Sequence, residues 1–146
     1  MFDLNNLVRE NIKDMVPYSS ARDEFQGDAK IYIDANENSL GSPLIKWYNR
    51  YPDPHQLKLK EKISAIKGIA PAHIFLGNGS DEAIDILFRA FCEPGRDNVI
   101  VCPPTYGMYE VSARINNISV KKVQLTTRFQ LHLEGLEEAI DPNTKI

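Results

Sequence analysis

The residues best suited to chemistry form a turn made of Gly77, Asn78, Gly79, Ser80 and Asp81. The apolar run 74–76 enters this turn. A helical pattern leaves it, with apolar residues spaced i, i+3, i+4 and i+7 at Ile84, Leu87, Phe88 and Phe91. A strand, a glycine turn and a helix in this order aim free backbone N–H groups and the positive end of the helix dipole at one spot. The stretch therefore predicts a site for a phosphate or a carboxylate.

The same turn has a purely structural interpretation. Gly, Asn and Ser are common between a strand and a helix, because turns need positive φ angles and helices need caps. Glu82 stands where the GxGxxG pattern has its third glycine, and the lysine of the Walker pattern is missing. Asp81 and Glu82 suit a helix N-terminus but would repel a phosphate that faced their carboxylates. The turn alone leaves both interpretations open.

A second turn, 103–107, follows another apolar run and carries Tyr106. Ligands of open α/β sheets bind beyond the carboxyl ends of the strands. If the two strands lie close together, Tyr106 faces the same hollow as the backbone of Gly79 and Ser80. An aromatic ring beside an anion site suits a planar ligand that carries a phosphate, whereas by itself Tyr106 could equally be a half-buried core residue.

The elements that must position these residues alternate between short apolar runs and amphipathic segments, which predicts an α/β fold with a mainly parallel sheet covered by helices. A short amphipathic helix is expected over 1–15, followed by a polar arm to residue 30. Strands are expected at 31–33, 73–76, 99–102, 119–125, briefly at 131, and beginning at 145–146. Helices are expected at 55–67, 81–91, 106–116 and 134–140. Asp53 with Pro54, and Thr105, are expected to begin two of these helices, and Gly68 with Pro71 to end the first.

Composition narrows the class of protein. The chain has 146 residues, 42% of them apolar and 25% charged, with a net charge of −3, which suits one globular domain and does not indicate a nucleic-acid surface. No apolar stretch is long enough to span a bilayer, and residues 1–11 lack the apolar block of a signal peptide. A cytoplasmic protein is the expectation.

Other candidate chemistry is sparse. The two cysteines, Cys92 and Cys102, lie in or beside apolar runs and are expected to be buried free thiols. The three histidines are scattered, so no zinc site is expected. The lysines of the helix 55–67 are expected to form a solvated face. No complete catalytic set appears, and the residues alone lead to an α/β domain that binds a phosphorylated planar molecule.

Four motifs together resemble a known family. DANENSLG (34–41), RYPDP (50–54), LGNGSDEAI (76–84) and PPTYGMY (103–109) occur in this order at suitable intervals. They are similar to the amino-terminal part of the histidinol-phosphate aminotransferases, which are fold-type I pyridoxal-phosphate enzymes. The resemblance implies a three-layer αβα large domain, incomplete over 31–146, preceded by a helix and arm over 1–30. It also implies transfer of an amino group between histidinol phosphate and 2-oxoglutarate, giving imidazole-acetol phosphate and glutamate in histidine biosynthesis, by a homodimer with shared active sites.

The resemblance assigns roles to particular residues. The backbone of Gly79, Ser80 and Asp81, with the Ser80 hydroxyl, would hold the phosphate of pyridoxal 5'-phosphate. Tyr106 would stack on the ring of this cofactor, and Tyr51 would reach the phosphate in the partner's site. Asn36 and Glu37 would lie near the substrate, and Tyr18 in the arm would help to close the site.

The resemblance also implies that residues are missing. Members of the family are much longer than this chain, and the lysine that forms their Schiff base lies in a motif that these 146 residues do not contain. None of Lys58, Lys60, Lys62 and Lys67 stands in that motif. No catalytic residue is therefore assigned, and we expect the chain alone to be an inactive amino-terminal part of an aminotransferase, with no metal and with an oligomer favoured by unpaired strand edges.

Two alternatives stay open. A neighbouring aminotransferase or a threonine-phosphate decarboxylase would share these amino-terminal motifs. A non-catalytic binding or assembly module could instead use the arm and exposed sheet edges.

Overall fold

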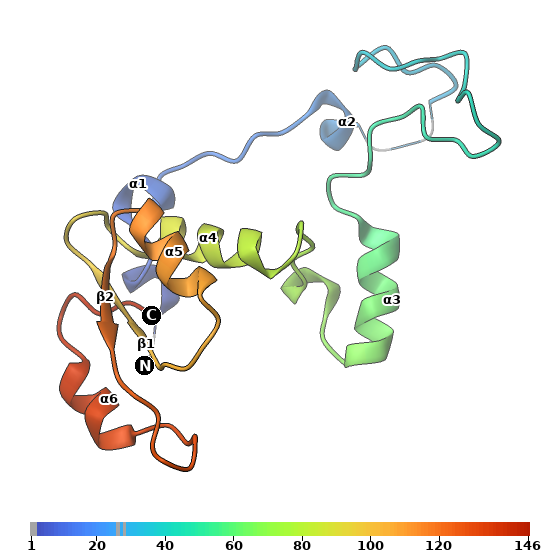
Figure 1. Ribbon diagram of the computed structural model, residues 1–146. Coiled ribbons are helices and arrows are strands. Elements are labelled where there is room, and N and C mark those ends of the chain that lie inside the picture. The colour runs from blue at the N-terminus through green and yellow to red at the C-terminus, as the bar shows by residue number, and fades with distance from the viewer. Residues whose placement is uncertain (1–2, 26, 28) are drawn as a thin grey trace. The chain divides into compact units, whose positions relative to one another are not determined.

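The computed structural model describes residues 3–25, 27 and 29–146, and the chain divides into two compact units (Figure 1). The first unit contains the described residues up to Met15 together with Gly77–Ile146. The second contains the described residues of Val16–Leu76. The expected boundary at residue 30 between an arm and a large domain stays a prediction.

A parallel sheet forms the centre of the first unit. Strand β1 (Asn98–Val101) pairs in parallel with β2 (Ser119–Lys122), with Val99 opposite Val120. The hydrogen bonding extends past β2, since the Val123 N–H donates to the Val101 carbonyl at 3.0 Å. The other edge of β1 is also occupied, because the Ile100 N–H donates to the carbonyl of Ile146 at 2.8 Å. The α/β class with a parallel sheet is thereby confirmed, and the last residues lie beside β1 as a beginning strand would.

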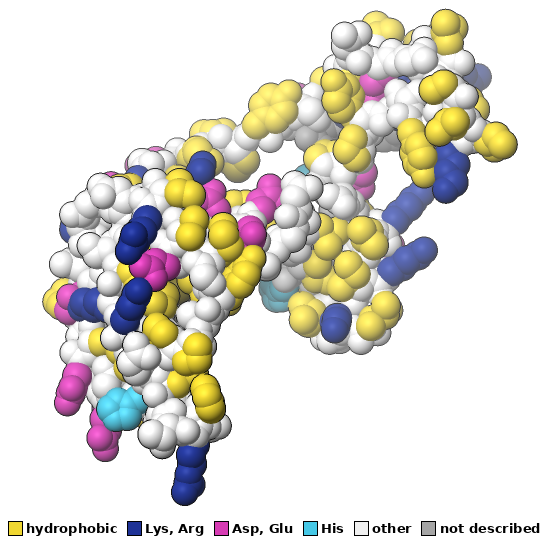
Figure 2. Space-filling view, viewed as in Figure 1, with side chains coloured by type: hydrophobic (Ala, Val, Ile, Leu, Met, Phe, Trp, Pro, Cys, Tyr) yellow, Lys and Arg dark blue, Asp and Glu magenta, His cyan; other side chains and the backbone are white. Residues whose placement is uncertain are grey.

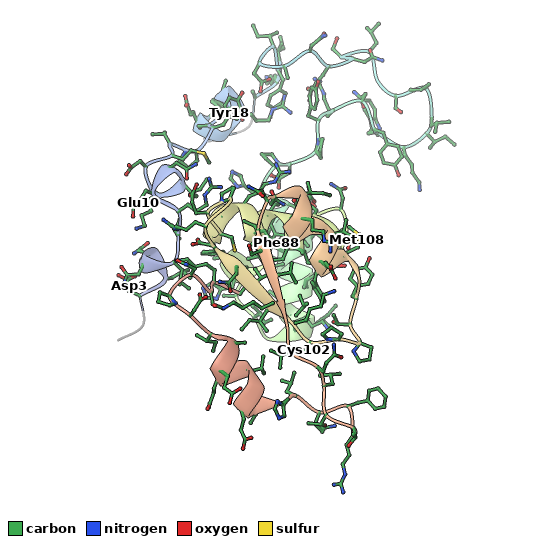
Figure 3. The ribbon with its side chains drawn as sticks, turned by 60° about the vertical axis from the view of Figure 1, so that its left-hand side comes forward. Asp3, Glu10, Tyr18, Phe88, Cys102 and Met108 are labelled. Atoms are coloured by element: carbon green, nitrogen blue, oxygen red, sulfur yellow. The ribbon has the colours of Figure 1, made fainter. Side chains whose placement is uncertain are left out.

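Two helices cover this sheet. Helix α4 (Ser80–Phe91) begins one residue before the predicted range 81–91, and α5 (Met108–Ile115) is the crossover between β1 and β2. Phe88, labelled in Figure 3, belongs to the hydrophobic core that these elements share. The core consists of Phe88, Cys92, Val99, Ala113 and Ile118. Both cysteines are free thiols, Cys92 buried and Cys102 half-buried.

The start of α5 differs from the expectation. The helix begins at Met108 with Gly107 at the N-cap position, so Thr105 does not cap it. The turn after β1 extends two residues further than predicted, and its last residues keep Tyr106 in the loop rather than in the helix. A further short helix, α6 (Leu133–Ala139), lies within one residue of the range expected, whereas the brief strand expected at Leu131 does not form.

The predicted helix over 1–15 is replaced, among the described residues, by two short turns, the 3-10 turn η1 (Leu4–Asn6) and α1 (Glu10–Lys13); residues 1 and 2 lie outside the described part. Arg9 separates the turns in an extended conformation, with φ −60° and ψ 142°. Its N–H donates to the carbonyl of Ala90 at 3.0 Å, and its guanidinium contacts Glu93 at 2.9 Å. These contacts with the end of α4 replace the hydrogen bond that a continuous helix would need at this position.

The second unit contains α2 (Ala21–Glu24), α3 (Leu57–Lys67) and the 3-10 turn η2 (Pro71–His73). Gly68 ends α3 with a φ of +67°, as predicted for a glycine after a helix. Gln56, rather than Asp53, is the N-cap residue, yet the Asp53 carboxylate still accepts hydrogen bonds from the N–H groups of His55 (2.9 Å) and Leu57 (3.2 Å).

The strands expected at 31–33 and 73–76 do not form. A strand needs a neighbouring strand to bond its N–H and C=O groups, and the described part of this unit provides none. Large apolar side chains are accordingly exposed, with Ile33 at 92% and Ile66 of α3 at 78%. Figure 2 shows such hydrophobic side chains, in yellow, on the surface of this unit.

Candidate functional site

The N-terminus of α4 presents unoccupied backbone donors. Gly79 is the N-cap residue, with φ +86° and ψ −179°, a conformation that is essentially restricted to glycine. Because Gly79 has no side chain, it cannot cap the first turn. Within the residues that the structure describes, no protein acceptor contacts the N–H groups of Ser80 and Asp81. The turn thus leaves at least two donors at the positive end of a twelve-residue helix.

The two acidic side chains of this first turn have partners of their own. The Glu82 carboxylate accepts from the Asn78 N–H at 2.5 Å and from its side-chain amide at 3.2 Å. The Asp81 carboxylate accepts from the Tyr106 hydroxyl at 3.3 Å. Both carboxylates are therefore engaged in holding the turn, and the backbone N–H groups are the donors that remain for an anion.

Tyr106 belongs to the loop between β1 and α5, and it is 52% exposed. Its ring meets that of Tyr109 edge-on, with centroids 5.9 Å apart. The hydrogen bond to Asp81 raises the pKa of Tyr106, so the phenol stays protonated and can donate. The structure brings Tyr106 together with Gly79, Ser80 and Asp81, the four residues that the sequence places at two separate turns.

Glu37 is the centre of a charged cluster in the second unit. Its side chain is 2% exposed. Oε1 accepts from the Tyr51 N–H at 2.6 Å and from Arg22 at 3.1 Å, and Oε2 accepts from Arg50 at 2.9 Å and from Arg22 at 3.1 Å. The hydrogen bonds from Arg22 and the Tyr51 N–H lower the pKa of Glu37 to about 2. Glu37 is therefore an ion at any pH at which a cell works.

Arg22 holds a second carboxylate in the same cluster. Its guanidinium donates to both oxygens of Asp34, at 2.8 and 2.9 Å, and this pairing lowers the pKa of Asp34. The guanidinium also lies 5.1 Å from the centre of the Tyr32 ring, close enough for a cation–π contact. Arg50 lies 5.9 Å from the same ring. Two cations, two anions and one aromatic ring thus fix the segments 22–37 and 50–51 to one another.

A shallow pocket of about 240 Å³ adjoins this cluster. Asn36, Glu37, Asn49, Arg50 and Tyr51 are among the residues that line it. The structure therefore brings together three of the four residues expected near the substrate or the partner's cofactor, namely Asn36, Glu37 and Tyr51. Tyr18, labelled in Figure 3, is 91% exposed beside α2 and does not line this pocket.

Sequence reasoning missed Arg22, Asp34 and Arg50. Arg22 lies in a polar stretch without periodicity, and its partners are 12 and 15 residues away. No local pattern pairs charges at such a spacing, since helical pairing works only three or four residues apart. The signal available in the sequence was that Asp34 and Arg50 lie in the motifs DANENSLG and RYPDP.

Two further findings concern metal ligands and membrane-spanning helices. In residues 3–25, 27 and 29–146, no three His, Cys, Asp or Glu side chains are grouped so that they could hold a metal ion. Across this same part of the chain, no helix combines the length and the apolar character that crossing a membrane requires.

Comparison with known proteins gives a consistent result. The family profile of class I and II aminotransferases matches residues 34–146. A histidinol-phosphate aminotransferase of Parabacteroides distasonis is 54% identical over 146 residues, which are 100% of this chain and 41% of that protein. One of Cytophaga hutchinsonii is 52% identical over 145 residues, which are 99% of this chain and 42% of that protein. The chain thus spans about two fifths of the length of these curated relatives.

Solved structures show the same fold. A crystal structure from Erwinia carotovora atroseptica, provisionally assigned as a histidinol-phosphate aminotransferase, matches with a TM-score of 0.54 and 30% identity over 62% of this chain and 26% of that one. The structure of OvoB matches with a TM-score of 0.54 over 70% of this chain and 28% of that one. Its sequence identity to this chain is 16%, so this match supports only the fold.

Proposed function

Because this chain belongs to the class I and II aminotransferases, we propose that the whole protein is a pyridoxal-phosphate-dependent aminotransferase. Its proposed reaction moves an amino group between histidinol phosphate and 2-oxoglutarate, in either direction. The observation that carries the proposal is the exposed first turn of α4, where the N–H groups of Ser80 and Asp81 have no protein acceptor among the described residues and the Tyr106 hydroxyl contacts the Asp81 carboxylate. The names of the relatives that are more than half identical to this chain support the choice of substrate.

The residues present fit the cofactor. A phosphate is an anion that accepts hydrogen bonds, and the turn at Gly79 supplies backbone donors and a positive helix end with no capping side chain in the way. A side chain at position 79 would meet nothing within 4 Å, so the space in front of this turn is open. The carboxylates of Asp81 and Glu82 are hydrogen-bonded to Tyr106 and Asn78, which leaves the backbone N–H groups as the donors for a phosphate.

Pyridoxal phosphate, when bound, supplies the electron sink that amino-group transfer requires. In this chain Ser80 and Asp81 would bind the phosphate through their N–H groups, with the Ser80 hydroxyl as a further donor. Tyr106 would stack on the ring and hold its orientation. None of these residues is proposed to move a proton in the reaction, and no lysine of this chain is proposed to react with the cofactor.

The resemblance also assigns roles to residues of the second unit. We propose that Tyr51 reaches the cofactor phosphate of a partner subunit, and that the loop carrying Asn36 and Glu37 lies beside the substrate, with Tyr18 helping to close the site. A homodimer would follow from this arrangement. The second unit has exposed apolar side chains that contact with such a partner would bury: Ile31, Ile33, Leu40, Ile45 and Trp47.

The test is to express the protein from its complete reading frame and to measure bound cofactor by visible absorbance and activity against a panel of amino donors. Bound pyridoxal phosphate with preferred turnover of histidinol phosphate is the expected result. Failure to bind the cofactor would refute the enzyme class. Preference for another amino acid, or decarboxylation of threonine phosphate, would refute the substrate while leaving the cofactor site intact.

A further inference from the structure

We propose that Glu37 is a positioning residue, which fixes the backbone of Tyr51 so that the Tyr51 phenol can reach a ligand phosphate. The role of Tyr51 rests on the proposed function, whereas the contact between Glu37 and Tyr51 is a property of this chain. The proposal changes what the Glu37 carboxylate is expected to do. It lies in the loop beside the substrate, but its direct partners are protein groups.

The Glu37 carboxylate has no free lone-pair position for a further hydrogen-bond donor. An ionised carboxylate offers about four lone-pair positions. Four donors of the protein contact the two Glu37 oxygens, at distances between 2.6 and 3.1 Å. Three of these donors are guanidinium N–H groups, whose charge-assisted hydrogen bonds are stronger than neutral ones. A substrate would have to displace an arginine to reach this carboxylate.

The backbone of Tyr51 is held, whereas the residue is exposed. The N–H of Tyr51 makes the shortest bond of the cluster, 2.6 Å to Glu37 Oε1. The Tyr51 side chain, by contrast, is 63% exposed. A residue with a fixed backbone and an exposed phenol is prepared to bind something outside its own chain, at a smaller entropic cost than a residue in a free loop.

The Glu37 side chain, which holds the Tyr51 backbone, is itself held in place by Arg22 and Arg50. Arg22 donates to both Glu37 and Asp34, and Asp34 is held at both of its oxygens. Arg50, the residue before Tyr51, donates to the other oxygen of Glu37. Glu37 is therefore bonded to two consecutive residues, and rotation of the 50–51 peptide would break its contact with the Tyr51 N–H. These two contacts set the direction in which the Tyr51 side chain points away from the backbone.

The first experiment needs no cofactor. Amide hydrogen exchange of Tyr51 is measured in the 146-residue chain, in Glu37→Gln, and in the control Glu61→Gln, which changes an exposed acid on α3. Glutamine has one acceptor oxygen and cannot serve all four donors. We expect the Tyr51 amide to exchange about tenfold faster in Glu37→Gln and at the original rate in Glu61→Gln. Equal rates in all three chains would overturn the proposal.

The second experiment separates positioning from a general structural role, in the protein from the complete reading frame. Affinity for pyridoxal phosphate is measured in Glu37→Gln, Tyr51→Phe and the double variant, with pyridoxal, which lacks the phosphate, as the comparison ligand. Each single variant is expected to weaken pyridoxal-phosphate binding about tenfold. The double variant should be no weaker than Tyr51→Phe, because Glu37 acts only through Tyr51. Pyridoxal binding should not change.

Three outcomes would overturn the proposal. The affinity losses of the two single variants could multiply in the double variant, or Glu37→Gln could lose as much affinity for pyridoxal as for pyridoxal phosphate. Glu37→Gln could also bind pyridoxal phosphate as tightly as Glu61→Gln does. A protein that binds no pyridoxal phosphate in any form would instead refute the proposed function, and with it the cofactor role of Glu37. The exchange rates would in that case still decide whether Glu37 holds Tyr51.

Discussion

The Tyr106 hydroxyl donates a hydrogen bond of 3.3 Å to the carboxylate of Asp81, which joins the loop after β1 to the first turn of α4. The two residues are 25 positions apart in the chain. Their contact brings an exposed aromatic ring to a helix N-terminus that has unoccupied donors. It also gives the Asp81 carboxylate a partner other than the ligand, so that an anion can approach the backbone.

Replacing Gly79 by alanine should cost about 1–3 kcal/mol of unfolding free energy, because φ +86° with ψ −179° is strained for any residue with a Cβ. The added methyl group itself meets nothing within 4 Å, so the cost is backbone strain alone. Gly107→Ala is the matched control, since Gly107 has a helical φ of −64° and open space around it. Urea denaturation of both variants measures the difference, and equal stabilities would contradict the strain.

Tyr106→Ala should weaken retention of pyridoxal phosphate about tenfold in the protein from the complete reading frame, because a stacking surface is lost. Tyr106→Phe keeps the ring and removes only the hydrogen bond to Asp81, so its retention should lie between that of the original protein and that of Tyr106→Ala. Dialysis followed by absorbance of the remaining cofactor provides the measurement. If Tyr106→Ala retains the cofactor fully, Tyr106 has no stacking role.

The charged cluster should make the second unit sensitive to acid. The pKa of Glu37 falls from an ordinary value of 4.5 to about 2 in the folded chain, mainly through Arg22. A lowered folded pKa means that the stabilisation is present above pH 4.5 and is lost as the pH falls toward 2. The hydrogen bond from Arg22 also lowers the pKa of Asp34, so protonation of Asp34 at low pH should destabilise the unit as well.

Trp47 is the single tryptophan and lies in this unit, so its fluorescence reports the acid transition. The transition should begin below pH 4.5 and be less steep in Glu37→Gln, with Glu61→Gln as the control. Identical acid titrations of Glu37→Gln and the original chain would show that the cluster does not stabilise the unit.

Phe88→Ala should destabilise the first unit by about 3–5 kcal/mol, the usual cost of a cavity left by a buried phenylalanine. Phe88 is 4% exposed and packs in the core between α4 and the sheet. Phe129 of the same unit is 71% exposed, and its replacement by alanine should change stability by less than about 0.5 kcal/mol. Thermal unfolding followed by circular dichroism compares the two, and similar midpoints would mean that this core is not formed in solution.

The purified 146-residue chain should show no transamination of histidinol phosphate. The resemblance to the aminotransferases assigns none of its lysines to the position that reacts with the cofactor, and that reaction is what the enzyme class requires. Formation of glutamate from 2-oxoglutarate in the presence of pyridoxal phosphate is the assay. Turnover above a heat-denatured sample would show that the assignment of the lysines is wrong.

The sequence by itself was sufficient for elements whose signal is local. The spacing of Ile84, Leu87, Phe88 and Phe91 together with the glycine turn predicts α4 to within one residue of its observed start, and the β-branched run 99–101 predicts β1. The run 31–33 has the same local character but forms no strand, because a strand exists only where a second strand accepts its hydrogen bonds. Local patterns therefore identified candidates for strands, and pairing decided among them.

The candidate site divides in the same way. The types of Gly79, Ser80 and Asp81 at the start of a helix predict an anion site from sequence, because the free donors are a property of any helix N-terminus. Only the tertiary structure brought Tyr106 to Asp81 and placed Glu37 against the N–H of Tyr51. These contacts join residues that are 14 and 25 positions apart in the chain. They form only when the tertiary fold brings the distant segments together, so no pattern of neighbouring residues predicts them. The sequence thus determined which groups are available, and the folded chain decided which of them meet.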